Sequence, residues 1–216
     1  MDPDTVAIDE NPEHTAAIAH FRSIAWTAKY LESIKYKFVP TSSRHLKPTG
    51  EDAFFARTIN TPTTIPYCLS LRRHDLPLPQ AGSPFNQTTS TSGTTSLKSS
   101  VPAVFDCVWL LHLAEPGING HPKTAHGGVL ACILDELTGM CAILHQLDRS
   151  IPIYTASLET TYKAPIFVPS NVICTSWVTR KEGRKYWVRA QILDEKGTLM
   201  TEGDALLVES KTKQKL

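Results

Sequence analysis

The segment from Val129 to Leu147 constrains the fold of this 216-residue chain more than any other, because apolar side chains occupy most of its positions. A helix that is apolar all round is surrounded either by protein or by lipid. Asp135 and Glu136 stand near its middle, and a carboxylate at the centre of a bilayer costs several kcal/mol. The segment is therefore expected to be a buried helix wrapped by protein, with no membrane insertion.

The residues around this helix predict an antiparallel sheet. Phe105–Leu113, ahead of it, has the apolar run of a buried strand. One helix followed by a run of strands indicates the α+β class, in which the sheet packs on the helix. The later strands are expected in four stretches rich in β-branched and aromatic residues and separated by turn signals, near residues 153–162, 171–180, 185–193 and 198–208.

The first half of the chain predicts an N-terminal extension, followed by the start of the main domain and an insertion within that domain. Apolar residues recur every three or four positions from Glu13 to about Lys37, which predicts an amphipathic helix packed on the main domain. Residues 53–71 predict one or two short strands. Eleven of the eighteen residues from 83 to 100 are Ser or Thr, and such a stretch buries too little apolar surface to order itself. The expected domains are an N-terminal extension over 1–52, a main domain over 53–210 with a disordered insertion at about 80–100, and a tail over 211–216.

Charge and cysteine usage exclude several classes of function. The 22 basic and 21 acidic residues give a net charge of +1, so no global basic field exists to hold nucleic acid. The five cysteines are odd in number and form no CxxC pair, and no His/Cys/Asp set has metal-ligand spacing, which argues against a disulfide scaffold or a metal site. The acidic N-terminus does not resemble a signal peptide or a mitochondrial presequence. A cytoplasmic location is expected, and the C-terminal KTKQKL leaves a peroxisomal location as the alternative.

His126, Gly127 and Gly128 open the apolar helix and form a candidate anion-binding turn. The first N–H groups of a helix have no internal partner, the helix dipole favours negative charge there, and glycine lets a ligand approach the backbone closely. These are the requirements of an oxyanion hole. A plain turn into a helix would explain the same residues, since glycine is tolerated at helix starts.

Asp135 is the candidate acid inside the helix. A carboxylate in apolar surroundings tends to have a raised pKa and suits general-base work. A structural ion pair with an Arg or Lys is the alternative, and Glu136, about 100° further round the helix, is the rival acid. A ligand, water or another helix can approach the Asp135 face, because its neighbours three and four residues away are all small: Ala131, Cys132, Thr138 and Gly139.

The spacing of the two candidate groups has a geometric consequence. Eight residues separate Gly127 from Asp135, which is about 12 Å along a helix axis. One helix therefore cannot bring its own Asp135 to a carbonyl held at its own start, whereas two antiparallel copies can. If both groups serve one reaction, the protein is at least a twofold dimer with shared sites.

Three motifs, in this order and spacing, resemble the hotdog-fold acyl-CoA thioesterases of the 4-hydroxybenzoyl-CoA thioesterase superfamily. They are the His-Gly-Gly turn with Asp135 nine residues after the His, TASLETTYKAP at 155–165, and EGRK at 182–185. The resemblance is to the phenylacetate-pathway-type (PaaI-like) branch, and GHPKTAHGG with LDE is more like its fungal members. It covers residues 104–209 well and 53–71 loosely. It implies a hotdog fold, in which a five- or six-stranded antiparallel sheet wraps a long helix, assembled as a homodimer or a tetramer.

The resemblance also implies a role for each matched residue. Asp135 matches the catalytic acid, as general base or nucleophile, and the Gly127 N–H matches the oxyanion donor, with His126 beside it. Thr155 matches a hydroxyl that orients the water or the carboxylate. The residues expected to contact the substrate or its CoA moiety are Gly128, Thr161, Lys163, Lys181, Arg184 and Lys185.

Three of these placements carry conditions. Many relatives have an Asn or Gln six residues before the His of the turn, where this chain has Gly120, so Asn119 can serve only if the loop bulges by one residue. Thr155 opens an alternating strand, which should point its hydroxyl the same way as Ser157 and Glu159. The basic residues of the 180–185 turn suit the phosphates of CoA, although a solvated hairpin tip explains them equally well.

The leading interpretation is a thioester hydrolase that releases a carboxylic acid from an acyl-CoA and needs no cofactor apart from the CoA moiety of its substrate. Two alternatives stay open. One is a trans-acting thioesterase that releases an acyl or polyketide chain from an acyl carrier protein in a fungal biosynthetic pathway. The other is a non-catalytic acyl-binding hotdog protein.

Overall fold

The computed structural model describes residues 12–76 and 101–211. The predicted insertion at about 80–100 and residues 212–216 of the predicted tail lie outside the described residues.

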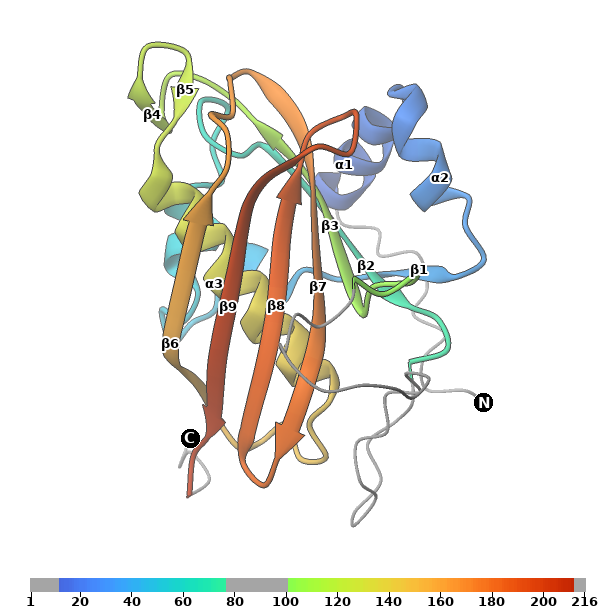
Figure 1. The fold of residues 1–216 in the computed structure, drawn as a ribbon. Coiled ribbons are helices and arrows are strands. Elements are labelled where there is room, and N and C mark those ends of the chain that lie inside the picture. The colour runs from blue at the N-terminus through green and yellow to red at the C-terminus, as the bar shows by residue number, and fades with distance from the viewer. Residues whose placement is uncertain (1–11, 77–100, 212–216) are drawn as a thin grey trace.

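One antiparallel sheet and one long helix form the body of the molecule (Figure 1). The helix α3, Gly127–Leu144, lies in the curve of the sheet and contacts β3 and β6 to β9. A two-stranded hairpin, β4 Asn119–His121 and β5 Thr124–Ala125, precedes it. The sheet has the strand order β1-β2-β3-β7-β8-β9-β6, with β1 Tyr36–Val39, β2 Tyr67–Arg73, β3 Cys107–Leu113, β6 Ile153–Tyr162, β7 Ser170–Glu182, β8 Lys185–Leu193 and β9 Leu199–Glu209.

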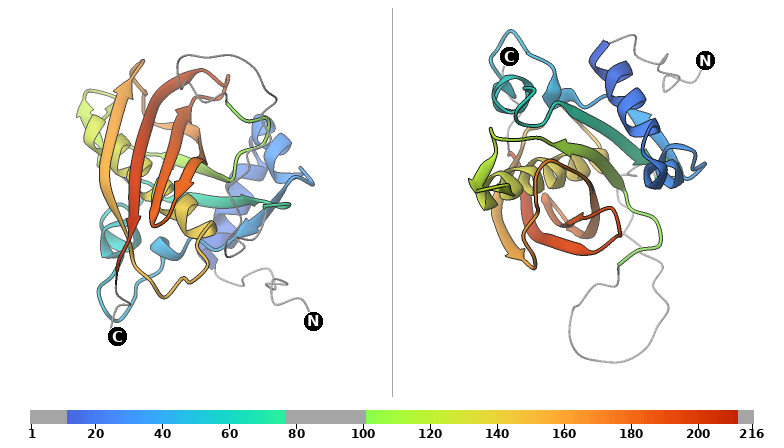
Figure 2. Two further views of the ribbon diagram at one scale, coloured as in Figure 1. Left: turned by 60° about the horizontal axis from the view of Figure 1, so that its bottom comes forward. Right: turned by 90° about the horizontal axis from the view of Figure 1, so that it is seen from above.

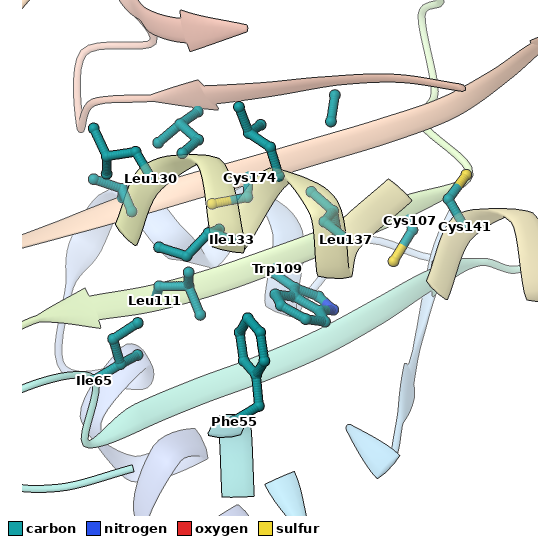
Figure 3. Packing of buried hydrophobic residues seen from close by; sticks show 14 of the residues in the cluster. Phe55, Ile65, Cys107, Trp109, Leu111, Leu130, Ile133, Leu137, Cys141 and Cys174 are labelled. Carbon is teal, nitrogen blue, oxygen red and sulfur yellow. The ribbon is translucent and has the colours of Figure 1, made fainter. Parts of the chain in front are cut away.

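The α+β prediction, with a sheet wrapped around a central helix, is confirmed. By length and composition α3 could span a membrane, with a mean hydropathy of 1.7, but its apolar side chains pack against the sheet. Trp109 and Leu111 of β3 meet Ile133 and Leu137 of α3 in this core (Figure 3). Removing a Leu or Ile side chain from water contributes about 1.5–3 kcal/mol, so the contact with the sheet holds the helix in place.

The helical part of the N-terminal extension packs on the opposite face of the sheet (Figure 2). Its helix α1, Pro12–Arg22, buries Ala17 and Phe21 against β2, β3 and β7. The prediction that this segment packs on the main domain is confirmed, but a single helix to Lys37 is wrong. The buried Thr27 hydroxyl donates to the carbonyls of Phe21 and Ile24, which satisfies the end of α1. After this break come a 3-10 turn at Ala25–Thr27 and a short helix, α2 Ala28–Leu31.

The extension also supplies an edge strand that the sequence analysis did not predict. Tyr36–Val39 pairs with β2, so the sheet has seven strands, one more than the largest number expected. In the 53–71 segment the second predicted strand is β2, whereas Phe54–Thr58 is a π-helical turn. Apolar residues that recur at short intervals fit either a strand or a helical turn, and here the buried Phe55, packed on Trp109, stabilises the turn.

Phe21 tests whether α1 and the sheet unfold as one unit. Phe21 is fully buried, and replacing it with alanine leaves a cavity, so Phe21→Ala should lower the free energy of unfolding by about 3–5 kcal/mol. Urea denaturation followed by tryptophan fluorescence measures it. Ile34→Ala is the matched control, because Ile34 is 92% exposed. A loss of stability no greater than that of the control would show that α1 is not part of the cooperative unit.

Candidate active site

The first turn of α3 has one N–H group without an acceptor. His126 caps the helix, and its ring Nδ1 accepts a hydrogen bond from the Gly128 N–H at 2.9 Å. The N–H groups of Val129 and Leu130 donate to the His126 carbonyl, at 3.0 and 3.3 Å. Within the part of the chain that the structure describes, the Gly127 N–H has no acceptor. It is therefore the donor at the positive end of the helix dipole that is available to an oxyanion.

A pocket of about 290 Å³ opens beside this N–H group. Tyr162, at the end of β6, forms one wall: its hydroxyl donates to the Gly127 carbonyl at 2.8 Å, and a Cβ on Gly127 would lie 3.3 Å from its ring. The structure thus brings the predicted residues Gly127 and Lys163 to one pocket. The lining residues are Ala125, Gly127, Leu130, Tyr162, Lys163, Ala164, Pro165 and Ile166.

The sequence predicted the neighbouring residues Thr161 and Lys163 as substrate contacts and did not single out Tyr162. Thr161 pairs with Glu202 across β6 and β9, and directly opposed residues share a face of a sheet. Lys163 forms an ion pair with the same Glu202 at 3.0 Å. Tyr162 is instead in phase with Leu158, on the face toward α3. The alternation of side chains along β6 was the signal that could have identified Tyr162, because it puts Thr161 on the face away from the helix.

The hairpin before α3 contains the one-residue bulge that the Asn119 prediction required. Asn119 pairs with Ala125, and the register shifts between Asn119 and His121. A Cβ on Gly120 would lie 2.9 Å from the Cα of His126, so the position six residues before the His requires glycine. Asn119 lies beside Ala125, a wall of the pocket, and its buried Oδ1 has no hydrogen-bond partner among the described residues. Its role stays a prediction.

Asp135 and Glu136 lie in different environments on α3. The Asp135 side chain is exposed in the single chain, so the apolar setting expected for it is not present there. Glu136 is half-buried, and burial raises its pKa, with the negative charges of Asp52 and Asp135 adding to the effect and Lys47 opposing it. The raised pKa that an apolar setting predicts is therefore found at Glu136, the rival acid.

A β-bulge in β6 changes the face on which Thr155 lies. Ser157 is opposed by Leu206 and Thr155 by Leu207, so Ala156 is the extra residue. Leu207 is buried in the core beside α3, which puts Thr155 on the helix side of the sheet. The expectation that Thr155 points the same way as Ser157 and Glu159 is therefore wrong, because the extra residue reverses the alternation.

The basic turn lies at the far end of α3. Lys181 donates to the carbonyl of His145, the C-cap of α3, at 3.0 Å, and burial lowers its pKa. Arg184 donates to the Glu209 carbonyl at 2.6 Å. The helix is 18 residues long, which places this turn about 27 Å from Gly127 of the same chain. One chain therefore does not bring the predicted CoA-binding residues to its own pocket.

Residues 122–201 match the model of the thioesterase superfamily. The fold is the hotdog fold of that superfamily. The mouse acyl-coenzyme A thioesterase THEM4 is 42% identical over 93 residues, 42% of this chain and 38% of the mouse protein. A yeast relative, the uncharacterized mitochondrial membrane protein FMP10, is 27% identical over 96 residues, 44% of this chain and 39% of that protein.

The chain thus spans less than half the length of these curated relatives. Among solved structures, it is similar to zebrafish thioesterase superfamily member 2, with 17% identity, a TM-score of 0.43, and coverage of 51% of this chain and 78% of that one. The cytoplasmic prediction is not confirmed, since one relative is named for a mitochondrial membrane.

At the far end of the helix, the hotdog domain contains a buried polar cluster of Asp106, Cys141 and His145, whose potential ligand atoms lie within 4.8 Å of one another. Spacing along the sequence does not reveal this set, because Asp106 precedes α3 whereas Cys141 and His145 lie at its end. The carboxylate accepts hydrogen bonds from His145 Nε2 and the Val178 N–H, both at 3.0 Å. These bonds anchor the end of α3 to the sheet.

Glu136 should make the stability of the hotdog domain depend on pH. Burial raises the folded-state pKa, so the folded state binds the proton more tightly and stability falls as pH rises from the unfolded toward the folded pKa. Glu136→Gln removes the free-energy cost of keeping an ionised carboxylate buried at this position. Urea denaturation should show a gain in stability at pH 7.5 that disappears at pH 3.5. Glu195→Gln, in the exposed β8–β9 turn, is the control. A gain that is equal at both pH values would contradict the assignment.

Proposed function

We propose that this protein is an acyl-CoA thioester hydrolase whose site is shared by two copies of the chain. The observation that carries the proposal is the Gly127 N–H, which has no acceptor among the described residues and belongs to a residue that lines a pocket at the positive end of a buried helix. A thioester carbonyl held there would place its developing negative charge on a preorganised donor. The likeness to a protein named acyl-coenzyme A thioesterase, over 93 residues, supports the same chemistry.

The acid would come from the partner copy. Asp135 lies about 12 Å along α3 from Gly127, too far to act on a carbonyl at the start of its own helix. Its side chain is exposed in the single chain, and the small residues around it leave room for a second body. An antiparallel second helix would bring Asp135 of the partner subunit to the Gly127 pocket.

The edge strand β6 offers the surface for this pairing. Within residues 12–76 and 101–211 its only neighbour is β9, so its outer backbone edge is unpaired over Ile153–Tyr162. Tyr162 is level with Gly127, because the two are hydrogen-bonded. The twofold axis must lie halfway between the levels of Gly127 and Asp135, about 6 Å from Tyr162, which is about two strand residues. The axis would therefore pass near Thr160.

The proposed reaction uses Asp135 in one of two ways. As a general base, its carboxylate takes a proton from water while the water oxygen attacks the thioester carbonyl; the C–S bond then breaks and the CoA thiolate takes the proton. As a nucleophile, it attacks the acyl carbon, the C–S bond breaks, CoA leaves as the thiolate and an anhydride forms. Water then hydrolyses the anhydride, which frees the carboxylic acid and restores the Asp135 carboxylate, and the thiolate takes up the proton that this water releases. Thr155 lies on the helix side of β6 and would orient the water or the carboxylate. The Asn119 amide, beside Ala125, would contact the bound thioester.

The CoA moiety would reach the basic turn of the partner. In the antiparallel pair, the far end of the partner's α3 would lie about 15 Å beyond the start of the other helix, compared with about 27 Å from Gly127 to the 180–185 turn within one chain. Lys181 and Arg184 already donate to backbone carbonyls, whereas the exposed Lys185 has no ion-pair partner among the described residues. Lys185 is therefore the most available phosphate ligand of the three.

Several finer points stay predictions. They are the PaaI-like branch, the fungal-like character, a tetramer built from dimers, and the absence of a cofactor. The carrier-protein alternative also stays open, since the pocket beside Gly127 would receive the same thioester from either carrier.

Asp135→Asn tests the chemistry. The amide keeps the size of the side chain but accepts no proton and is no nucleophile, so kcat should fall about 10³-fold. Thiol release from acyl-CoAs of varied chain length measures it, with acyl-carrier thioesters beside them. Glu136→Gln is the matched control on the next residue of the same helix and should keep wild-type turnover. Loss of turnover in Glu136→Gln with full turnover in Asp135→Asn would reverse the assignment of the acid.

Thr160→Cys tests the register of the pair. The axis near residue 160 places the two introduced cysteines opposite one another, within the 4.4–6.8 Å between Cα atoms that a disulfide needs. Mild oxidation should give a covalent dimer on non-reducing gels. Ser157→Cys, on the same strand, should not, because its copies would lie about 20 Å apart. Cross-linking at 157 but not at 160, or a monomer in sedimentation equilibrium, would overturn the shared-site geometry.

A further inference from the structure

We propose that Tyr162 is a positioning residue that aims the Gly127 N–H into the pocket, an inference that rests on the proposed thioester hydrolysis. Two consecutive glycines begin α3, and glycine has the widest range of backbone conformations. Left to itself, such a turn would fray, because the first N–H groups of a helix lack intrahelical partners. A preorganised oxyanion donor needs a fixed direction.

The peptide unit between Gly127 and Gly128 is held at both of its polar ends. The Tyr162 hydroxyl donates to its carbonyl oxygen at 2.8 Å, and its N–H donates to His126 Nδ1 at 2.9 Å. Since the peptide unit is planar, these two bonds fix its orientation. Tyr162 and His126 therefore act on the same peptide from opposite sides.

The aromatic ring restricts the same residue a second time. A Cβ on Gly127 would lie 3.3–3.4 Å from ring atoms of Tyr162, so the ring packs against the α-carbon of this glycine. The Gly127 N–H belongs to the preceding peptide unit, whose His126 carbonyl accepts from the N–H groups of Val129 and Leu130. Rotation about the two backbone bonds of Gly127 sets the angle between that unit and the one that Tyr162 holds. Contact with the ring limits that rotation. The hydroxyl and the ring together thus hold the donor toward the pocket that Tyr162 also lines.

The position of Tyr162 in the chain makes this contact specific. It is the last residue of β6 and lies on the face toward α3, in phase with Leu158. Leu158 packs on the core cluster, which fixes the strand beneath the helix. Tyr154, near the other end of the strand, is also exposed, but the bulge at Ala156 puts it on the opposite face. One strand thus offers two tyrosines, of which one reaches the helix start.

Tyr162→Phe separates the hydroxyl from the ring. If the hydroxyl positions the oxyanion donor, its loss weakens an interaction realised in the transition state, so kcat should fall about 10-fold while KM for the acyl-CoA stays within twofold. The melting temperature should not change. Tyr162→Leu removes both restraints and should lose more of kcat. Tyr154→Phe is the matched control and should keep wild-type kcat and KM.

Amide hydrogen exchange supplies a readout that is independent of turnover. In NMR spectra, the Gly128 amide, which donates to His126 Nδ1, should exchange faster in Tyr162→Phe than in wild type and Tyr154→Phe, while amides in the middle of α3 stay unchanged. Wild-type kcat together with wild-type exchange at Gly128 would overturn the positioning role. A rise in KM with a lower melting temperature and unchanged kcat would also overturn it, because that result indicates a merely structural residue.

The Asp135→Asn variant distinguishes failure of the positioning role from failure of the proposed function. Inactive Asp135→Asn beside fully active Tyr162→Phe would reject the positioning role and leave the proposed function standing. Full turnover in Asp135→Asn would reject the proposed acid and leave the Tyr162 comparison to be judged on kcat and exchange. A wild-type protein that releases no thiol from any thioester would remove the proposed function and the positioning role with it.

Discussion

The burial of α3 against the concave face of the sheet fixes where each candidate group can lie. Its apolar side chains meet β3 and β6 to β9, so the helix cannot rotate or slide without exposing them. The start of the helix then faces the end of β6 and the hairpin before α3, where the pocket forms. Its middle presents Asp135 to the outside of the single chain. Its end is anchored to the sheet through Asp106 and His145.

The same packing leaves a single domain that is incomplete for the proposed chemistry. The donor and the acid are on one rigid helix, so their separation of about 12 Å cannot be closed by a loop movement. Among the described residues, the edge of β6 is unpaired and the Asp135 side chain is exposed, so a second copy could cover both. A strand that remained unpaired there would be open to non-specific association. Pairing this edge and completing the site are therefore one structural event in the proposed dimer.

The elements that the sequence predicted well are those with a long, unambiguous pattern. The apolar run of α3 and the four strands after it were recognisable because burial on one or both faces dictates their residue types. Tyr36–Val39 was missed because four residues are too short for a periodic signal and the helical spacing before it continued across them. Thr155 was assigned the wrong face because a bulge is a backbone feature that leaves little trace in side-chain type. Tyr162 was missed because its partner is a backbone carbonyl, which no motif encodes.

The adjacent carboxylates of α3 show how the N-terminal extension divides the helix into two flanks. Ser42 of the extension contacts Met140 on α3, and Lys47 and Asp52 lie near Glu136. The extension therefore covers the flank that carries Glu136, and burial there disfavours its ionised form. Asp135, about 100° round the helix, is left uncovered and in water. An exposed carboxylate is the one that a partner subunit can reach. The extension thus helps to decide which of the two acids is free, although none of its described residues lines the pocket.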